Sequence, residues 1–317
     1  MNATPLIVDI VRDSRVDGPG IRTVVFFKGC PLRCVFCQNP EAQETVPEIA
    51  FFPDKCIQCD NCAEACSRGA IQASLQGRIV RDRCAACGQC AEACPTGAIR
   101  RIGRSYDLQE LENTLLRDES FHRCSNGGVT FSGGESTMFP DYLAHLLKAL
   151  KRHDAHVVLQ TCGWFAYDMF AKHLLPYVDL IQFDVKFADP ELHERFTGRS
   201  NTRIVENLRR LLHESPQKVE PRIPLIPGIT ATEANLSALV RLLRDAGALT
   251  FRLLPYNPLG FSMWEALGRS RPNVPDHFMD RSEEERIYDR VGKLLRSNRN
   301  SGIPGRSPLD QSSPDDR

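Results

Sequence analysis

The stretch TVVFFKGCPLRCVFC, residues 23–37, decides how the rest of the chain is interpreted. It opens with the apolar run Thr23–Phe27, which predicts a buried strand. It ends in three cysteines spaced C-x3-C-x2-C, namely Cys30, Cys34 and Cys37. Three thiolates leave one iron of a four-iron cluster without a protein ligand, whereas a structural site is closed by a fourth ligand. The sequence therefore predicts a reactive cluster at the carboxyl end of a strand, where barrel enzymes carry their chemistry.

Composition narrows the class of protein. The chain has 317 residues, room for one large and one small domain, and its 40 Lys+Arg balance 40 Asp+Glu. Because no basic stripe is present, we expect no nucleic-acid partner. Asp9, Arg12 and Asp13 interrupt the apolar N-terminal stretch, and no apolar run approaches the ~20 residues that cross a bilayer. We therefore expect a cytoplasmic protein with no membrane partner.

The cysteines indicate metal ligation rather than disulfides. Eleven of the 13 fall into three tight groups, and Cys124 and Cys162 stand apart as ordinary small apolar residues. Disulfides suit a short secreted chain, not a long one without a signal peptide. The eight histidines show no metal-binding spacing.

An internal repeat marks an inserted domain. Residues 54–71, DKCIQCDNCAEACSRGAI, and residues 82–99, DRCAACGQCAEACPTGAI, match at 11 of 18 positions. Each carries C-x2-C-x2-C-x3-C, the spacing of bacterial two-cluster ferredoxins, in which the fourth cysteine of each run binds the other cluster. A pair of zinc sites is the alternative, but zinc ribbons pair two C-x2-C knuckles across a longer gap. The predicted ligand sets are Cys56, Cys59, Cys62 and Cys94 for one [4Fe-4S] cluster, and Cys84, Cys87, Cys90 and Cys66 for the other.

Outside the repeat, strand-like runs alternate with amphipathic helices, of which residues 143–150 and 236–243 are the clearest. This alternation implies βαβ units and a parallel sheet. We expect an α/β fold, a partial (β/α)6 TIM-like barrel with an inserted α+β ferredoxin-like domain. The predicted strands are residues 23–27, 128–132, 156–161, 180–186, 221–226 and 249–256.

The expected domain boundaries follow from the repeat. Residues 1–49 and 103–297 form the discontinuous barrel, and residues 50–102 form the insert with two [4Fe-4S] clusters. The insert is too short for a large core, so its clusters are expected to stabilise it. Residues 298–317, polar and rich in Ser, Pro and Asp, are expected to be a disordered tail.

Polar motifs follow the second and fourth predicted strands. Gly133 and Gly134 would let a ligand approach the backbone closely, and Glu135 could accept a hydrogen bond from a ligand ammonium. Asp184 and Lys186 share one side of a strand because side chains alternate, and they could clamp a zwitterion. A plain turn is the alternative for the two glycines, and a plain ion pair is the alternative for Asp184 and Lys186. Beside an open-iron cluster, such groups suit S-adenosylmethionine, whose amino acid part can chelate iron.

These motifs also carry a family resemblance. C-x3-C-x2-C with GGE resembles the radical S-adenosylmethionine superfamily. VDGPGIRTVVFFKGCPLRCVFCQNPE, with GGVTFSGGES, DVK, HERFTGRSN, RIPLIPG and LLPYNPLG, resembles the activating enzymes of glycyl radical enzymes, from about Ile7 to Arg296. The cysteine-rich insert resembles the longer members of that family.

The resemblance implies an anaerobic oxidoreductase that activates a partner glycyl radical enzyme. Such an enzyme cleaves S-adenosylmethionine reductively, and the 5′-deoxyadenosyl radical removes a Cα hydrogen from one glycine of the partner. The implied cofactors are S-adenosylmethionine and three [4Fe-4S] clusters. The implied electron donor is flavodoxin or ferredoxin, and the chain is expected to act as a monomer. The insert clusters would relay electrons or form a docking platform; the alternative is that they only stabilise the fold.

The resemblance assigns roles to individual residues. It places the open-iron cluster on Cys30, Cys34 and Cys37, and it places Asp17 and Arg222 near the incoming glycine loop. Arg222 could equally be a structural ion-pair partner. The cofactor contacts that it implies are Phe36, Cys37, Gln38, Gly133, Gly134, Glu135, Asp184, Val185, Lys186 and Asn257.

Two positions depart from the family pattern. Asn257 stands where the family often has His, so it keeps hydrogen bonding but cannot titrate. Gln160 precedes Thr161 where some relatives carry Asp. Two alternative functions stay open: a radical enzyme acting on a small molecule or peptide, with the insert as auxiliary clusters, and a multi-cluster electron carrier. The carrier would need neither the open-iron triad nor GGE and DVK.

Overall fold

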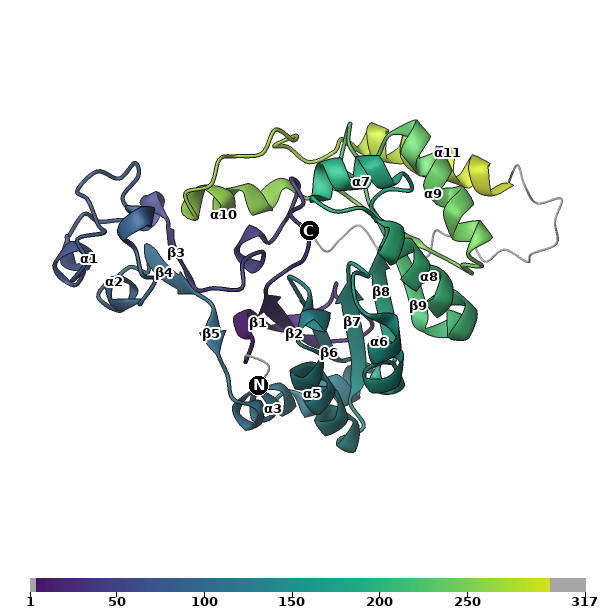
Figure 1. Ribbon diagram of the computed structural model, residues 1–317, viewed down its shortest axis with the longest axis horizontal. Helices are drawn as coiled ribbons and strands as arrows, with labels where there is room; N and C mark the ends of the chain where they lie inside the picture. Colours follow the sequence, from purple (N-terminus) through teal and green to yellow (C-terminus); the bar gives the residue numbers. More distant parts are fainter. Residues whose placement is uncertain (1–3, 297–317) are drawn as a thin grey trace. The chain divides into compact units, whose positions relative to one another are not determined.

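The computed structural model describes residues 4–296 (Figure 1). These residues divide into two compact units. Within the described residues, the first unit comprises residues 4–159, 166–179 and 258–276. The second comprises residues 160–165, 180–257 and 277–296. The tail predicted at 298–317 lies outside the described residues. Among the described helices, none is both long and apolar enough to cross a membrane.

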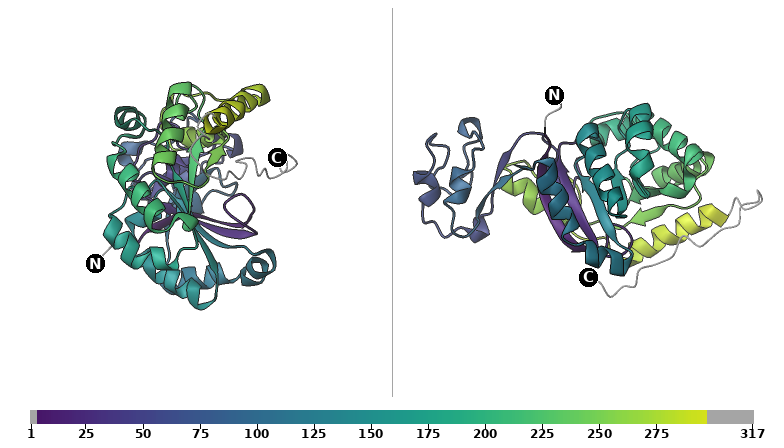
Figure 2. Two further views of the ribbon diagram at one scale, coloured as in Figure 1. Left: turned by 90° about the vertical axis from the view of Figure 1, so that its right-hand side faces the viewer. Right: turned by 90° about the horizontal axis from the view of Figure 1, so that it is seen from below.

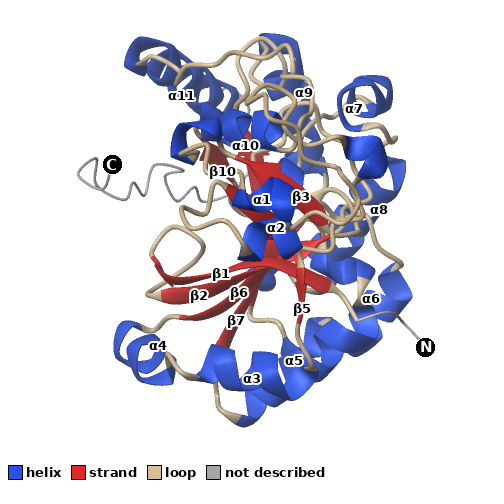
Figure 3. Ribbon diagram, turned by 90° about the vertical axis from the view of Figure 1, so that its left-hand side faces the viewer, coloured by secondary structure: helices blue, strands red, loops and turns tan. Residues whose placement is uncertain are grey.

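Strand β2 (Arg22–Lys28) is central to the sheet of the first unit, and it is buried along almost its whole length. It pairs in parallel with β6 (Gly128–Gly133), which pairs in parallel with β7 (His156–Thr161) (Figure 3). A strand buried on both faces reads as a continuous apolar run, as residues 23–27 do. The strands predicted at 23–27, 128–132 and 156–161 are therefore confirmed.

Two antiparallel strands complete this sheet and were not predicted. β1 (Leu6–Ser14) pairs with β2, and β5 (Arg104–Ser105) pairs with β1. β1 carries Asp9 and Arg12 on its exposed positions, so its charges interrupt the apolar signal. An antiparallel strand tolerates this because one of its faces can meet water.

Helices of the first unit follow the predicted amphipathic pattern. In α5 (Pro140–Arg152), Leu143, Leu146, Leu147 and Leu150 are fully buried. Asp107 caps α3 (Leu108–Leu116), accepting a hydrogen bond from the Glu110 amide. The helices of this unit outside the insert are α3 (Leu108–Leu116), α4 (Glu119–Ser125), α5, α6 (Tyr167–His173) and α10 (Phe261–Ala266).

The insert lies between β2 and β6 in sequence, within the first unit. Its residues are drawn in blue in Figure 2. Its strands β3 (Glu48–Phe51) and β4 (Ile99–Ile102) pair antiparallel, and its repeats each hold one short helix, α1 (Asn61–Glu64) and α2 (Gln89–Glu92). Its small core combines aliphatic side chains with cysteines. The buried members are Ile49, Phe51, Cys62, Ile79, Cys90, Ala98 and Ile99.

The second unit holds a parallel sheet in the order β8 (Leu180–Asp184), β9 (Val219–Pro224), β10 (Arg252–Leu254). Figure 1 shows α8 (Thr202–Glu214) and α9 (Glu233–Asp245) close to β8 and β9. Thr232 caps α9, and Gly247 follows the helix with φ 83°, as its predicted stop requires. The helices of this unit are α7 (Pro190–Thr197), α8 (Thr202–Glu214), α9 (Glu233–Asp245) and α11 (Arg281–Arg296).

The predicted bounds of three strands were wrong. β9 covers Val219–Pro224 rather than residues 221–226. β8 ends at Asp184 rather than at residue 186, so Asp184 and Lys186 do not share one face of a strand. After a last bridge from the Val185 amide to the Arg222 carbonyl (2.8 Å), the backbone leaves the ladder. The Lys186 carbonyl accepts instead from the Asn235 side chain (3.0 Å). β10 is likewise shorter than the predicted 249–256.

Short 3-10 helices connect these elements in both units. They are η1 (Pro40–Ala42), η2 (Pro53–Lys55), η3 (Arg81–Arg83), η4 (Ser136–Met138), η5 (Leu175–Tyr177), η6 (Pro216–Lys218) and η7 (Pro258–Gly260).

Candidate functional site

The three cysteines of the C-x3-C-x2-C motif lie on residues 29–43, here called the cysteine loop, directly after β2. The loop is closed at its base, because the Gly29 amide donates to the Ala42 carbonyl (2.8 Å) and the Cys30 amide to the Gln43 carbonyl (3.0 Å). Cys34 is buried, and Cys30 and Cys37 are partly buried. The loop therefore presents the three thiols together from a fixed base.

Electrostatic interaction joins the three thiols. Burial raises the pKa of the Cys37 thiol well above its ordinary value, and the neighbouring Cys34 and Cys30 raise it further. Three thiolates this close repel one another unless positive charge lies among them. An iron cluster supplies that charge and binds thiolate sulfur, so the donor set fits a [4Fe-4S] cluster.

The loop rests on the end of β6, at the predicted SGGES motif. The Gly134 amide donates to the Phe27 carbonyl (2.8 Å), and the Glu135 amide donates to the Gly29 carbonyl (2.7 Å). A Cβ atom on Gly134 would come within 2.1 Å of the Gly29 carbonyl oxygen. Glycine is therefore required here by the approach of the cysteine loop itself, a reason that the sequence did not reveal.

Glu135 is fully buried and has a structural partner. Its Oε1 accepts hydrogen bonds from the Thr137 hydroxyl (2.6 Å) and the Thr137 amide (3.3 Å). The carboxylate thus caps η4, the turn that follows the motif. This contact fixes the side chain beside the loop.

Three other predicted residues of the first unit, Phe36, Gln38 and Asp17, lie in different surroundings. Phe36 is buried within the cysteine loop, and Gln38 is exposed. Asp17 lies between β1 and β2, where its side chain accepts from Ser14 Oγ (2.6 Å) and its carbonyl accepts from Thr130 Oγ1 (2.9 Å). Ser14 pairs with the first residue of β2, whereas Cys30 follows the last. The seven residues of β2 span about 20 Å, so Asp17 and Cys30 lie near opposite ends of this strand.

In the second unit, Asp184 is held by two cations. Arg222 donates to Asp184 Oδ1 through Nη2 (2.7 Å) and Nε (3.0 Å), and Lys186 Nζ lies 3.2 Å from Oδ2. Burial raises the pKa of Asp184, but Arg222 and then Lys186 outweigh it, so the pKa falls below its usual range. The ion pairs that the sequence left as alternatives for these residues are therefore present.

A glutamine pair, Gln160 and Gln182, extends this network, and Gln182 was missed. Gln182 Oε1 accepts from Arg222 Nη1 (2.9 Å) and from Gln160 Nε2 (3.0 Å), and Gln182 Nε2 donates to Glu220 (3.2 Å). The pairing of β8 with β9 sets Gln182 against Glu220 and Asp184 against Arg222. Period-two alternation from Asp184 could have suggested Gln182, but the register of β9 is not visible in sequence.

Two other predicted contacts of the second unit have contrasting environments. Val185 is buried directly after β8. Asn257 is exposed after β10, next to the buried Tyr256.

In the insert, Cys56, Cys59, Cys62 and Cys94 line one pocket. Arg78 lines it too, is 1% exposed, and points Nη2 at Asp60 (2.7 Å) and at the Cys62 sulfur (3.4 Å). Its buried Nε has no hydrogen-bond partner. A buried guanidinium beside four thiols suits the negative charge of a thiolate-bound cluster.

The other four insert cysteines also influence one another. Burial raises the pKa of the Cys90 thiol to about 11, and Cys84, Cys66 and Cys87 raise it in turn. Backbone amides donate to two of these sulfurs, Ala70 to Cys66 (3.3 Å) and Ala86 to Cys84 (3.4 Å). Such amide–sulfur bonds are typical of iron–sulfur ligands. The grouping of the thiols is compatible with the two predicted ligand sets, whose occupation by clusters stays a prediction.

No group of His, Cys, Asp or Glu side chains among residues 4–296 is set to hold a single metal ion. The sulfur ligands of a four-iron cluster bind separate irons, which is a different arrangement.

The similarity to known proteins covers most of the chain. The model of the Radical SAM superfamily matches residues 24–239. The isethionate sulfite-lyase activating enzyme of Nitratidesulfovibrio vulgaris is 39% identical over 276 residues, which are 85% of this chain and 89% of that protein.

Two further relatives activate different enzymes. The choline trimethylamine-lyase activating enzyme of Oleidesulfovibrio alaskensis is 36% identical over 290 residues, 89% of this chain and 93% of that protein. The trans-4-hydroxy-L-proline dehydratase activating enzyme of Clostridioides difficile is 34% identical over 305 residues, 95% of this chain and 99% of that protein.

Proposed function

The chain belongs to the radical SAM superfamily and, within it, to the activating enzymes of glycyl radical enzymes, and on this premise we propose that Cys30, Cys34 and Cys37 hold its catalytic cluster. The protein is an oxidoreductase that uses a [4Fe-4S] cluster and S-adenosylmethionine. When bound, these cofactors supply the reductive cleavage and the radical that is transferred to a glycine of a partner glycyl radical enzyme. The observation that carries the assignment is a closed loop at the carboxyl end of β2 in which the Cys37 thiol interacts electrostatically with those of Cys34 and Cys30.

The chain's own groups orient the cofactor. We propose that Gly133, Gly134 and Glu135 border its amino acid part. In support, this motif contacts the base of the cysteine loop through the Gly134 and Glu135 amides. Phe36, buried within the same loop, is proposed to face the adenine, with Gln38 as a polar neighbour.

Charged groups of the second unit are proposed to recognise the zwitterion. Asp184 would accept from the ammonium, and Lys186 would donate to the carboxylate. Arg222 supports this role because it binds Asp184 Oδ1 through two nitrogens and so holds the carboxylate in one orientation. Val185 and Asn257 are proposed as the further contacts of this unit, Asn257 through hydrogen bonds only.

The partner's glycine loop is proposed to meet Arg222 and, near the opposite end of β2 from the thiols, Asp17. Arg222 has a firm anchor in Asp184, and Asp17 has one in Ser14 Oγ (2.6 Å). Both residues can therefore present charge without a large loss of side-chain freedom. These roles come from the family resemblance.

The insert, residues 50–102, is proposed to carry two more [4Fe-4S] clusters, which gives three in the chain. Residues 1–49 and 103–297 would then form the partial barrel. The pocket of four thiols with Arg78 supports the first insert cluster, and the interaction of Cys90 with three thiols supports the second. We propose that these clusters relay electrons from flavodoxin or ferredoxin, and that the chain acts as a monomer.

One anaerobic experiment tests the proposal. Protein reconstituted with iron and sulfide is mixed with dithionite, S-adenosylmethionine and a candidate glycyl radical enzyme, and the glycyl radical is sought by electron paramagnetic resonance. Cys34→Ala should abolish both cofactor cleavage and the radical. Cys124→Ala is the matched control because Cys124 is exposed and outside every predicted ligand set, and it should leave both unchanged. Continued cleavage by the Cys34 variant would contradict the cluster assignment.

A further inference from the structure

Residues 258–276, here called the strap, contact the cysteine loop within the first unit. The Trp264 indole Nε1 donates to the Cys37 carbonyl (3.1 Å). Gly260 lies so close that a Cβ atom there would come within 2.6 Å of the Gln38 carbonyl oxygen. A segment more than 220 residues away in sequence is thus seated on the loop that carries the thiols.

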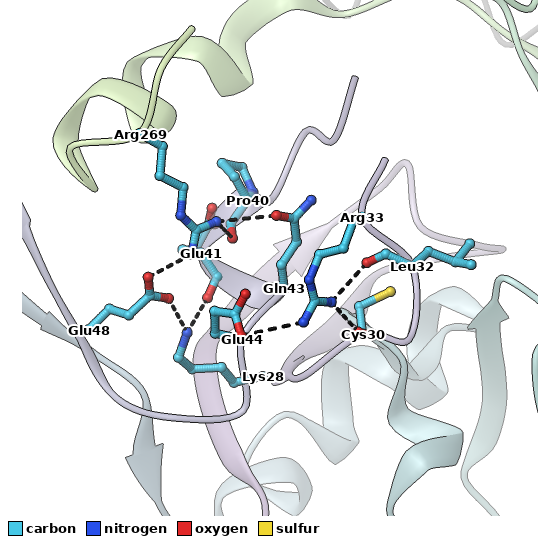
Figure 4. Close-up of polar contacts among 10 residues, drawn as sticks. All are labelled: Lys28, Cys30, Leu32, Arg33, Pro40, Glu41, Gln43, Glu44, Glu48 and Arg269. Atoms are coloured by element: carbon cyan, nitrogen blue, oxygen red, sulfur yellow. Dashed lines mark hydrogen bonds and ion pairs between the residues drawn. The ribbon is translucent and has the colours of Figure 1, made fainter. Parts of the chain in front are cut away.

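Arg269 of the strap donates hydrogen bonds to three partners, Pro40, Gln43 and Glu48 (Figure 4). Its Nη1 donates to the Pro40 carbonyl (2.6 Å) and to Gln43 Oε1 (3.2 Å), and its Nη2 donates to Glu48 Oε1 (2.6 Å). Arg269 is about four-fifths buried, since its side chain is 21% exposed. A planar guanidinium with several donors suits this fork of acceptors better than an ammonium does.

Glu48 joins Arg269 to the end of β2. Its other oxygen, Oε2, accepts from Lys28 Nζ (2.6 Å), and Lys28 also donates to the Glu41 carbonyl (2.6 Å). The Lys28 side chain is fully buried. Two cations therefore share one carboxylate beneath the cysteine loop.

The backbone of each cysteine is reached by this network. Gln43, which accepts from Arg269, donates through Nε2 to the Cys34 carbonyl (3.3 Å). The Gln43 carbonyl accepts from the Cys30 amide (3.0 Å). Trp264 holds the Cys37 carbonyl. Every thiol of the triad is thus attached to a backbone group that the strap fixes directly or through one glutamine.

We propose that Trp264 and Arg269 are positioning residues that set the geometry of the cysteine loop and thereby the affinity of its cluster site for S-adenosylmethionine. The inference rests on the proposed function of the cysteine triad. Groups that hydrogen-bond around metal ligands orient them and tune the metal, and their loss costs about 10- to 100-fold in affinity or activity. The strap also ties this geometry to the insert, because Ala266 and Leu267 pack with Ala50 and Ile102.

The test compares three strap variants in the reconstituted full chain. Arg269→Met removes the donors, Arg269→Lys keeps a charge without the planar fork, and Trp264→Phe removes the indole N–H with its five-membered ring but keeps an aromatic side chain. Arg271→Met is the matched control, because Arg271 lies in the same strap and pairs with the exposed Asp276 (3.1 Å). The readout is the change in the electron paramagnetic resonance spectrum of reduced protein on titration with S-adenosylmethionine. This change reports on the cluster that binds S-adenosylmethionine rather than on the proposed insert clusters.

We expect Arg269→Met to alter the spectrum and to weaken S-adenosylmethionine binding by about tenfold or more, and Arg269→Lys to recover part of the loss. Trp264→Phe should change the spectrum in a stably folded protein, and Arg271→Met should match the wild type. If both Trp264→Phe and Arg269→Lys retain the wild-type spectrum and affinity, the inference is overturned, even where Arg269→Met fails to fold. If the wild type itself shows no response to S-adenosylmethionine, the proposed function fails instead.

Discussion

At the scale of single residues, Asp184 shows how one carboxylate can serve both stability and recognition. It binds Arg222 and Lys186, and its side chain is only 25% exposed. Because both cations favour the ionised form, the pKa of Asp184 is lowered in the folded protein. The carboxylate therefore stabilises the fold at pH values where it is ionised.

We predict that Asp184→Asn lowers the free energy of unfolding by about 2 kcal/mol near pH 7, because two partly buried cations lose their counter-charge. A lowered folded pKa stabilises above the unfolded pKa of about 4 and loses its effect as pH falls through the folded value. The gap between wild type and variant should therefore narrow below pH about 4. Urea unfolding across this pH range measures it, with the exposed Asp245→Asn as control. A gap that does not change with pH would contradict the role of the ionised carboxylate.

At the scale of elements, the end of β6 and the cysteine loop fit together through glycine. A Cβ on Gly134 would lie 2.1 Å from the Gly29 carbonyl oxygen and 2.5 Å from that of Ala42. Real Cβ atoms do not approach backbone so closely, so one of the two elements must move. The position of the cysteine loop, and therefore of its three thiols, depends on this contact.

Gly134→Ala should therefore destabilise the first unit by about 1–3 kcal/mol and reduce iron incorporation. Thermal unfolding and iron content per chain check this prediction. Gly292→Ala in α11 is the matched control, because the nearest atom to its Cβ would be the flexible Arg296 side chain at 3.4 Å. That change should be neutral or slightly stabilising, since alanine favours a helix more than glycine does. Equal iron content in both variants would argue against the steric explanation.

At the scale of the whole molecule, the core around the main sheet of the first unit and the core of the insert differ in the side chains that stabilise them. The first unit buries β2, β6 and α5 around aliphatic and aromatic side chains. The insert has a small core in which Cys62 and Cys90 are buried members. A core of this size gains much of its stability from bound metal.

Removal of iron by a chelator should accordingly loosen the insert before the sheet. Hydrogen exchange measured by mass spectrometry should accelerate across residues 54–99 and stay slow in β2 and β6. The matched comparison is protein chelated and then reconstituted, in which protection of the insert should return. An insert that remains protected without iron would show that its aliphatic side chains suffice.

Much of the fold could be predicted from the sequence because it depends on local patterns. The apolar strands at 23–27, 128–132 and 156–161 and the leucine-rich helices carry their periodicity within a few residues. β1 was missed because exposed charges mask its alternation. The end of β8 was misplaced because leaving the ladder depends on Asn235, which comes from another element.

The sequence by itself determined the family, the spacing of the three thiols and the repeated cysteine runs, because ligand spacing is a covalent property of the chain. Only the tertiary structure decided which distant groups support that site. It paired Arg222 with Asp184 through the register of two strands, and it brought Trp264 to Cys37 across 227 residues. Such contacts are set by the packing of whole elements, which no local period encodes. The thiols could therefore be named from the sequence, whereas the residues that hold their backbone could not.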